Sequence, residues 1–214
     1  MCRRIVVLIC TLLFTFFNMG VAQTAFTKMS NTEEFKTKLN EMSKLVKTIE
    51  SNFSQEKNLS ILSKAINSKG YFCYKKENKV RWEYTEPYSY LVIIRESKLF
   101  VKDKNNKKQY DTQSNKMFQE LNNFLVGCIN GDILSKTTDY KIEYMENNVQ
   151  FYVKLVPNSK KMKDMISEIH IYFDKKDYSV SRLKMVEQGG DYTNIEFLNK
   201  KLNGVISDEK FIFN

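Results

Sequence analysis

RWEYTEPYSYLVII, residues 81–94, is the stretch that decides the fold class of this chain. Trp82 and Tyr84 alternate with Arg81 and Glu83, so the aromatic and the charged side chains lie on opposite faces. The stretch then ends on an apolar run that only Tyr and Ser interrupt. This pattern predicts antiparallel strands with one buried face.

The same period of two continues on both sides of this stretch. We expect antiparallel hairpins because the apolar segments are joined by short polar turns. In chain order the segments are GYFCYKK-ENK-VRWEYTEP, YLVIIR-ESK-LFVKD, QYD, YKIEYME-NN-VQFYVKLVP, ISEIHIYFD-KK-DYSVSRLKMVE, YTNIEFLN and a final KFIFN, with an earlier strand in SNFSQEK through Phe53.

Two segments have helical periodicity instead. The first runs from Ser30 to Ile49 and opens with a capping box formed by Ser30 and Glu33. The second runs from Ser114 to about Cys128 and ends near Asn130–Asp132. No internal repeat or linker interrupts the pattern. The order of helix, strands, helix, strands predicts a single α+β domain, in which helices cover one face of a large antiparallel sheet.

The first 22 residues read as a cleaved signal peptide. Arg3 and Arg4 precede the apolar run 5–17, and small residues at Gly20 and Ala22 predict cleavage before Gln23. We therefore expect a signal peptide at residues 1–22 and a soluble, exported domain at residues 23–214. Its two cysteines, Cys73 and Cys128, either form a disulfide in an oxidising compartment or remain two partly buried thiols.

The formal net charge of +9 has two possible interpretations. It is consistent with an acidic partner or an anionic membrane surface. The lysines are scattered among asparagines, as in KDKNNKKQYD, and this favours a solvated polar face. Binding to nucleic acid has little support, because no basic helix or aromatic RNA-binding motif accompanies the charge.

Catalytic and metal-binding patterns are missing from the sequence. G-x-S-x-G, H-E-x-x-H, C-x-x-C and P-loop motifs do not occur. The single histidine, His170, shares its strand face with Glu168 and Tyr172, and we expect it to be solvated on the outer face. We expect neither an enzyme nor a metal site nor a cofactor.

Apolar side chains gather on one face of nearly every predicted strand. These residues either form an ordinary core beneath the two helices or, because two helices cover few strands, line a hydrophobic cavity that takes an apolar ligand.

Two segments carry a family resemblance. GYFCYKKENKVRWEYTEPYSYLVI (residues 70–93) resembles the W-x-Y-x-x-P core of the LolA-like outer-membrane lipoprotein carriers, and MVEQGGDYTNIEFLNKKLNGVISDEKFIF (residues 185–213) resembles the closing hairpin of that family. The resemblance implies an incomplete antiparallel β-barrel, a strongly curved sheet whose concave face is covered by helices that act as a lid. It also implies a monomeric, soluble periplasmic carrier that receives lipoproteins from an inner-membrane ABC exporter and delivers them to an outer-membrane acceptor.

On this resemblance the cavity binds the acyl chains of lipoproteins. The expected lipid-binding residues are Phe72, Tyr74, Val80, Trp82, Tyr84, Phe151, Val153, Ile169, Ile171, Leu183, Ile195 and Phe197. Two other functions stay open: a lipid- or lipoprotein-sensing regulatory module, and a carrier of another lipid.

The resemblance also suggests a lid contact. Lys76 stands where the family has an arginine that holds the lid shut, and the expected lid residues are Lys76, Phe118, Leu121, Phe124 and Leu125. We expect the ammonium group of Lys76 to reach carbonyls at the end of the second helix. The alternative is a turn lysine free in water.

Overall fold

The computed structural model describes residues 25–111, 127, 132–135 and 138–213. The signal peptide and nearly all of the predicted second helix, including Cys128, lie outside these residues. The described elements are β1 (Thr27–Lys28), α1 (Thr32–Leu45), β2 (Thr48–Asn58), β3 (Ile66–Lys75), β4 (Lys79–Glu86), β5 (Tyr90–Arg95), β6 (Lys98–Lys102), β7 (Lys107–Asp111), η1 (Asp132–Ser135), β8 (Tyr140–Glu146), β9 (Gln150–Pro157), α3 (Lys160–Lys163), β10 (Ile166–Asp174), β11 (Val180–Glu187), β12 (Tyr192–Leu202) and η2 (Asp208–Phe211).

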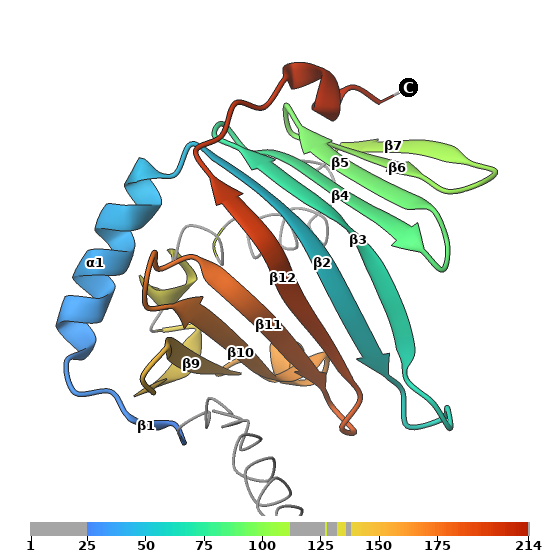
Figure 1. Ribbon diagram of the computed structural model, residues 1–214. Helices are drawn as coiled ribbons and strands as arrows, with labels where there is room; N and C mark the ends of the chain where they lie inside the picture. Colours follow the sequence, from blue (N-terminus) through green and yellow to red (C-terminus); the bar gives the residue numbers. More distant parts are fainter. Residues whose placement is uncertain (1–24, 112–126, 128–131, 136–137, 214) are drawn as a thin grey trace, which may run out of the picture.

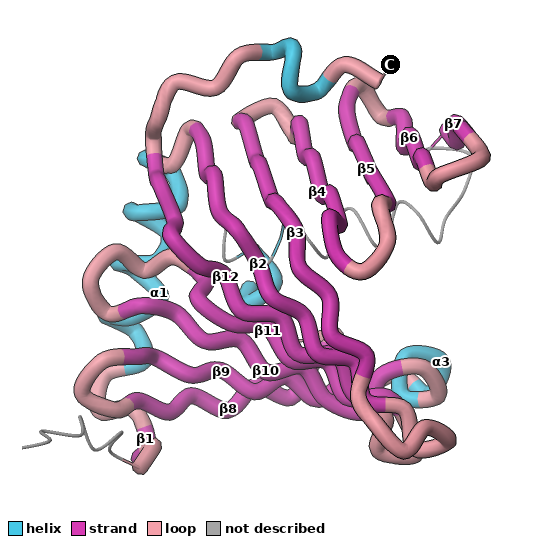
Figure 2. The backbone as a smooth tube through the Cα atoms, turned by 45° about the vertical axis from the view of Figure 1, so that its right-hand side comes forward, coloured by secondary structure: helices cyan, strands magenta, loops and turns pink. Residues whose placement is uncertain are grey.

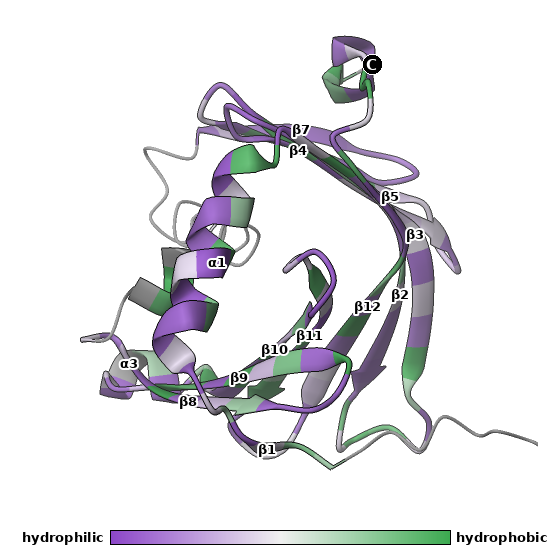
Figure 3. Cartoon of the chain, turned by 60° about the vertical axis from the view of Figure 1, so that its left-hand side comes forward, coloured by the Kyte–Doolittle hydropathy of each residue, from purple (hydrophilic) through white to green (hydrophobic). Residues whose placement is uncertain are grey.

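All twelve described strands belong to one antiparallel sheet. Its order is β1-β8-β9-β10-β11-β12-β2-β3-β4-β5-β6-β7, so the sheet begins at β1 and ends at β7 without closing. Figures 1 and 2 show the sheet curling into an open half-barrel, and Figure 3 shows α1 running along its hollow side. The predicted α+β class with one large antiparallel sheet is confirmed.

The short polar turns form the predicted hairpins. Residues 76–78 join β3 to β4, with φ of 75° at Glu77 and 60° at Asn78, and the two residues Glu96 and Ser97 join β5 to β6, with φ of 51° and 58°. Two successive residues with positive φ are typical of the two-residue turns whose twist matches that of the flanking strands. The first turn sets the register in which Trp82 faces Phe72, and the second sets the register in which Ile94 faces Leu99.

Gly70 allows the backbone of β3 to lie against a core aromatic ring. A Cβ atom at this position would stand 2.0 Å from the Glu83 carbonyl oxygen and 2.5 Å from the ring of Phe53. Because a Cβ atom cannot stand 2.0 Å from a backbone oxygen, only glycine fits here, and the Phe53 ring packs closely against this strand.

Three groups of buried apolar residues form the core. The first concave cluster lies on β8–β11 beneath α1, and the second concave cluster lies on β12 and β2–β6. The outer cluster lies on the convex side of β3, β5 and β6, beneath the C-terminal segment. Both concave clusters follow the predicted alternation of the strands.

The first helix differs from the prediction at both ends. Its N-cap is Asn31, which accepts a hydrogen bond from the Glu34 backbone N–H at 3.1 Å and donates to the Glu34 carboxylate at 3.0 Å, so the capping box is one residue later than predicted. The helix ends at Leu45, because Val46 is extended and Ile49 already belongs to β2. The β-branched residues after Leu45 explain this early end.

The predicted final strand KFIFN is wrong. Residues 208–211 form the 3-10 helix η2, whose N-cap Ser207 accepts a hydrogen bond from the Glu209 N–H. The segment crosses the outer face of the sheet and places Ile206 and Phe211 over Leu91, Ile93 and Phe100. The convex side of these strands is itself apolar, and the C-terminal segment removes it from water.

Cys73 lies under the same segment. Its side chain is completely buried in the outer cluster and its thiol is free. Burial raises the pKa of this thiol. The structure therefore places Cys73 as a buried apolar residue, which was one of the two alternatives.

Candidate functional site

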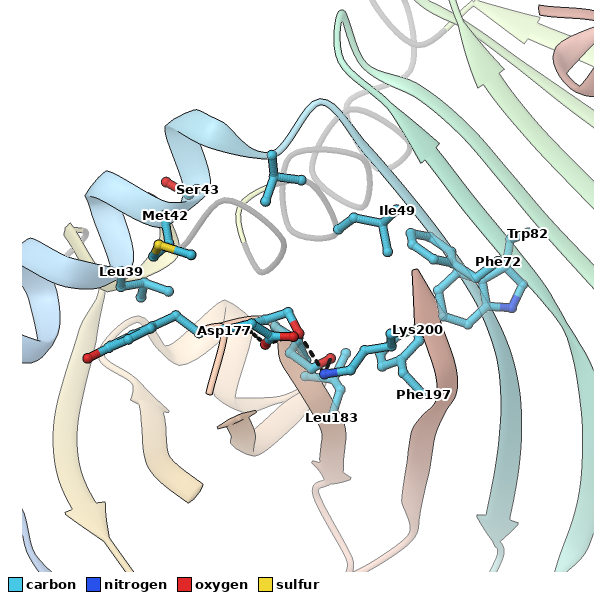
Figure 4. Close-up of a pocket in the computed structure, with 14 residues that line it drawn as sticks. Leu39, Met42, Ser43, Ile49, Phe72, Trp82, Asp177, Leu183, Phe197 and Lys200 are labelled. Carbon is cyan, nitrogen blue, oxygen red and sulfur yellow. Dashed lines mark hydrogen bonds between the residues drawn. The ribbon is translucent and has the colours of Figure 1, made fainter. Parts of the chain in front are cut away.

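A pocket opens on the concave side, where the two concave clusters meet. The empty space in the pocket and in the open solvent at its mouth together amounts to about 710 Å³. Fourteen residues line it: Leu39, Met42, Ser43, Val46, Ile49, Phe72, Trp82, Asp177, Tyr178, Ser179, Val180, Leu183, Phe197 and Lys200. Figure 4 shows α1 on one side of the pocket and the strands that carry Phe72 and Trp82 on the opposite side.

The helix supplies one wall. Phe35 and Leu39 are buried against β8–β11, and Leu39 and Met42 border the pocket. These residues recur at spacings of three and four, so they share one face of the helix. The helix therefore closes the first cluster with Phe35 and Leu39, and its last turns border the pocket.

Aromatic rings of the second cluster form the opposite wall. The Trp82 ring lies 5.2 Å from Phe72 and 6.0 Å from Phe197, both edge-on, and 4.9 Å from Phe53. Elsewhere in the second concave cluster, the Tyr84 hydroxyl donates to the Gln55 side-chain oxygen at 2.9 Å, and burial raises the Tyr84 pKa. This wall offers flat apolar surface, the kind that hydrocarbon chains pack against.

The remaining side of the pocket is polar and comes from the turn between β10 and β11. Tyr178 adopts a φ of 57° at this turn, and its ring packs on Phe35 and Phe151 at centroid distances of 6.3 and 5.3 Å. Asp177 and Ser179 flank Tyr178 and border the pocket. The packing of Tyr178 under α1 fixes the place of both polar neighbours.

Lys200 joins this polar side through an irregularity of β12. The pairing of β12 with β2 shifts between Leu198 and Lys201, and Asn199 has a φ of 55°. A bulge of this kind changes the face on which the following side chain lies. The lysine therefore borders the pocket, where strict alternation after Phe197 would have placed Asn199.

Lys76 reaches the end of helix α1. Its ammonium donates to the Lys44 carbonyl oxygen in the last turn of α1 at 3.3 Å, and its backbone N–H donates to the Lys47 carbonyl at 2.7 Å. A cation at the carbonyl end of a helix is favourable. The predicted acceptor helix lies outside the described residues, as do the lid residues Phe118, Leu121, Phe124 and Leu125.

The twelve predicted lipid-binding residues separate into two sets. Phe72, Trp82, Leu183 and Phe197 line the pocket. The other eight belong to the two concave clusters around it: Tyr74, Val80, Tyr84, Phe151, Val153, Ile169, Ile171 and Ile195. Sequence reasoning missed the α1 residues, the turn 177–180 and Lys200, because parity along strands gives no information on a helix, a turn or a bulge.

His170 is less exposed than the sequence predicted. It lies on the outer face, where Nδ1 is 2.6 Å from the Tyr152 hydroxyl and Nε2 is 3.0 Å from the Glu168 carboxylate. Its ring stacks on Tyr152 and its side chain is 15% exposed, and burial lowers its pKa. The prediction of a solvated histidine is wrong, because neighbouring aromatic residues of the sheet cover the ring.

Within the residues that the structure describes, no group of three or more His, Cys, Asp or Glu side chains is arranged to hold a metal ion. No helix in the same part of the chain is long and apolar enough to cross a membrane.

These features define the class: an antiparallel half-barrel, with a helix along its hollow side and an apolar pocket beneath that helix. Residues 44–214 match the family model described as outer membrane lipoprotein carrier protein LolA. The chain belongs to the LolA family.

Two solved structures, those with a TM-score of 0.51, show the same fold at low sequence identity. A conserved protein of Thermus thermophilus superposes with a TM-score of 0.51 at 10% identity, over 85% of this chain and 93% of the other. A chain of the MucA/MucB complex of Pseudomonas aeruginosa gives 0.51 at 10% identity, over 85% of this chain and 60% of the other. The LolA superfamily protein NE2245 of Nitrosomonas europaea gives 0.42 at 10% identity, over 86% and 99%. No curated protein matches the sequence.

Proposed function

We propose that this protein is a soluble periplasmic carrier that binds the acyl chains of lipoproteins in the pocket beneath α1. It would receive them from an inner-membrane ABC exporter and release them to an outer-membrane acceptor. Residues 1–22 would direct its export, and residues 23–214 would form the carrier domain. The family match and the apolar pocket support this proposal.

The observation that carries the proposal is the pairing of two apolar walls from different parts of the chain. Leu39 and Met42 stand on α1, and Trp82, Phe72 and Phe197 stand on the sheet. A hydrocarbon chain between these walls would be removed from water, and each buried methylene group contributes about 0.8 kcal/mol. Binding of this kind needs no catalytic group, in accord with the carrier proteins described by the family model.

Release would require the walls to separate, and α1 is the element best placed to move. Its last turn is held to the end of β3 by the side-chain contact from Lys76 to the Lys44 carbonyl. A contact of this strength biases a closed state without locking it. We infer that α1 acts as a lid and that Lys76 is one of its contacts.

The proposal is tested by measuring the mass of the molecule that remains bound to the purified protein. The protein is purified without detergent from the envelope of cells that express it, and it is measured by native mass spectrometry. We expect a species heavier by one lipoprotein, and we expect Phe197→Asp to lose it while keeping its fold. A free lipid in its place would indicate a carrier of another lipid. An inner-membrane regulatory protein would indicate the sensing module instead.

A further inference from the structure

The polar side of the pocket carries an unbalanced set of charges. Asp174, Asp177 and Lys200 lie together at the β10–β11 turn, and their formal charges add up to one negative charge. Figure 4 draws Asp177 and Lys200 on the side of the pocket that faces Met42 and Ser43 of α1. A ligand whose chain lies between the apolar walls would bring its head group to this end.

The ammonium group of Lys200 is already occupied. It donates to the Asp174 carboxylate at 2.6 Å, to the Ser179 hydroxyl at 2.6 Å and to the Val180 carbonyl oxygen at 3.3 Å. An ammonium group has three donors, and these three acceptors use all of them. An anionic head group would have to displace one of these acceptors, so Lys200 does not make this end an anion site.

Asp177 has the opposite character. Its Oδ1 accepts from the Ser179 backbone N–H at 2.9 Å and from the Ser179 hydroxyl at 2.6 Å. Among the described residues, no cation lies within 4.0 Å of its carboxylate, and its Oδ2 accepts no hydrogen bond. The neighbouring Lys175 is paired with Glu146 at 2.5 Å, and Lys176 is exposed. A negatively charged acceptor that has no cation partner among the described residues therefore borders the polar side of the pocket.

We propose that this end of the pocket binds a primary ammonium group on the head of the acylated ligand, with Asp177 Oδ2 as its acceptor. The inference rests on the proposed function and adds the chemistry of the head group. Two ligands have this chemistry: a lipoprotein whose N-terminal cysteine carries two acyl chains and a free α-amine, and an ethanolamine phospholipid. A cation in this position would balance the charge of Asp177 in a partly desolvated site.

The test compares two lipopeptides that differ by one charge. Both carry S-diacylglyceryl-cysteine, one with a free α-amine and one with an N-acetyl group, and binding is measured at pH 6.5, where an α-amine with a pKa of about 7.7–8.0 is protonated. We expect the wild-type protein to bind the free amine about tenfold more tightly, the effect of one charge-assisted hydrogen bond in a partly exposed site.

Asp177→Asn is the decisive variant because asparagine keeps an oxygen that accepts from Ser179. We expect it to bind both lipopeptides with the wild-type affinity for the N-acetyl form. Asp164→Asn removes the same charge from an exposed residue of the loop after α3 and should keep the tenfold preference. Lysophosphatidylethanolamine and lysophosphatidylcholine, measured in parallel, distinguish the phospholipid source from the lipopeptide source.

Equal binding of the two lipopeptides by the wild-type protein would overturn the head-group inference and leave the proposed function intact. A tenfold preference that survives in Asp177→Asn would overturn the assignment to Asp177. Failure of all four probes to bind would contradict the proposed function itself.

Discussion

The two halves of the concave face have the same alternation of apolar and polar residues, but they differ in how fully their apolar side chains are covered. On β8–β11, Val153, Leu155, Ile169, Ile171 and Phe173 are completely buried beneath α1. On β12 and β2–β6, Val80 and Phe53 are buried to the same degree, but Trp82 and Ile49 at the pocket are each 8% exposed, and Phe197 and Val92 are only partly buried. Alternation decides which face of a strand is apolar, whereas the position of the helix decides whether that face becomes a filled core or the wall of a pocket.

The largest effect is expected in the filled half. Phe35 is 2% exposed and contacts Tyr144, Phe151, Phe173 and Tyr178. We expect Phe35→Ala to lower the free energy of unfolding by about 3–5 kcal/mol, since it leaves a cavity that rigid strands cannot fill. Urea denaturation followed by circular dichroism measures this. A loss under about 1 kcal/mol, the size of an ordinary surface effect, would mean that α1 does not close this cluster.

The outer cluster provides the next test, because it should be independent of the pocket. Phe211 is 1% exposed and covers the cluster that contains Cys73. We expect Phe211→Ala to lower the free energy of unfolding by about 3 kcal/mol, at the low end of the range because the short 3-10 helix that carries Phe211 can shift to fill part of the cavity. The variant should also make Cys73 reactive toward a thiol reagent while acyl binding is unchanged. Loss of acyl binding in a variant that is still folded would show that the outer cluster and the pocket are not independent.

Substitutions in the half that borders the pocket should change ligand affinity more than the free energy of unfolding. Phe197 borders the pocket and is only partly buried. We expect Phe197→Ala to weaken binding of a fluorescent fatty acid about tenfold, since the ring removes apolar surface of the ligand from water. Tyr88→Ala removes an exposed aromatic side chain outside the pocket lining and is the matched control. Equal binding by both variants and the wild type would mean that the ligand binds outside this pocket.

A pH-dependent contact joins Ser30, just before α1, to β8 in the half of the sheet that α1 covers. The Glu146 carboxylate accepts from the Ser30 N–H and hydroxyl at 2.8 and 2.9 Å and pairs with Lys175. The Lys175 ammonium and the Ser30 N–H lower the Glu146 pKa from 4.5 to about 2. The stabilisation is therefore complete above about pH 4.5 and is lost as the pH falls toward 2.

Glu146→Gln tests this contact. We expect it to lower the free energy of unfolding at pH 7 by about 1 kcal/mol, a modest value because the pair is partly exposed. The difference from the wild type should shrink between pH 4.5 and about 2 in urea titrations at several pH values. A difference that stays constant over this range would contradict the assignment.

The same comparison explains which features of this protein are predictable from its sequence. The strand faces were predictable because a period of two is local, and Phe72, Trp82, Leu183 and Phe197 were found in that way. Lys200 was not, because the bulge after Leu198 depends on pairing with β2, which is far away in sequence. The C-terminal segment was mistaken for a strand because the alternation of Phe211 and Phe213 is the same whether a segment pairs with a sheet or lies across it.

The smallest effect concerns the lid contact. Lys76 donates an exposed hydrogen bond of 3.3 Å to the end of α1. We expect Lys76→Leu to speed release of a bound fluorescent fatty acid to acceptor vesicles about twofold, and Lys76→Arg to slow it by a similar factor. Stopped-flow transfer measurements resolve such differences. Identical release rates in all three proteins would exclude Lys76 as a lid contact.

The central claim, that an acyl chain lies between α1 and the aromatic wall, is tested most directly through Trp82. It is the only tryptophan of the chain and it lines the pocket. Titration with a fatty acid that is brominated along its chain should quench the fluorescence of Trp82 in a saturable manner at one ligand per protein. An excess of the unbrominated acid should restore the fluorescence. A ligand that binds with the same stoichiometry and leaves the fluorescence unchanged would contradict the account.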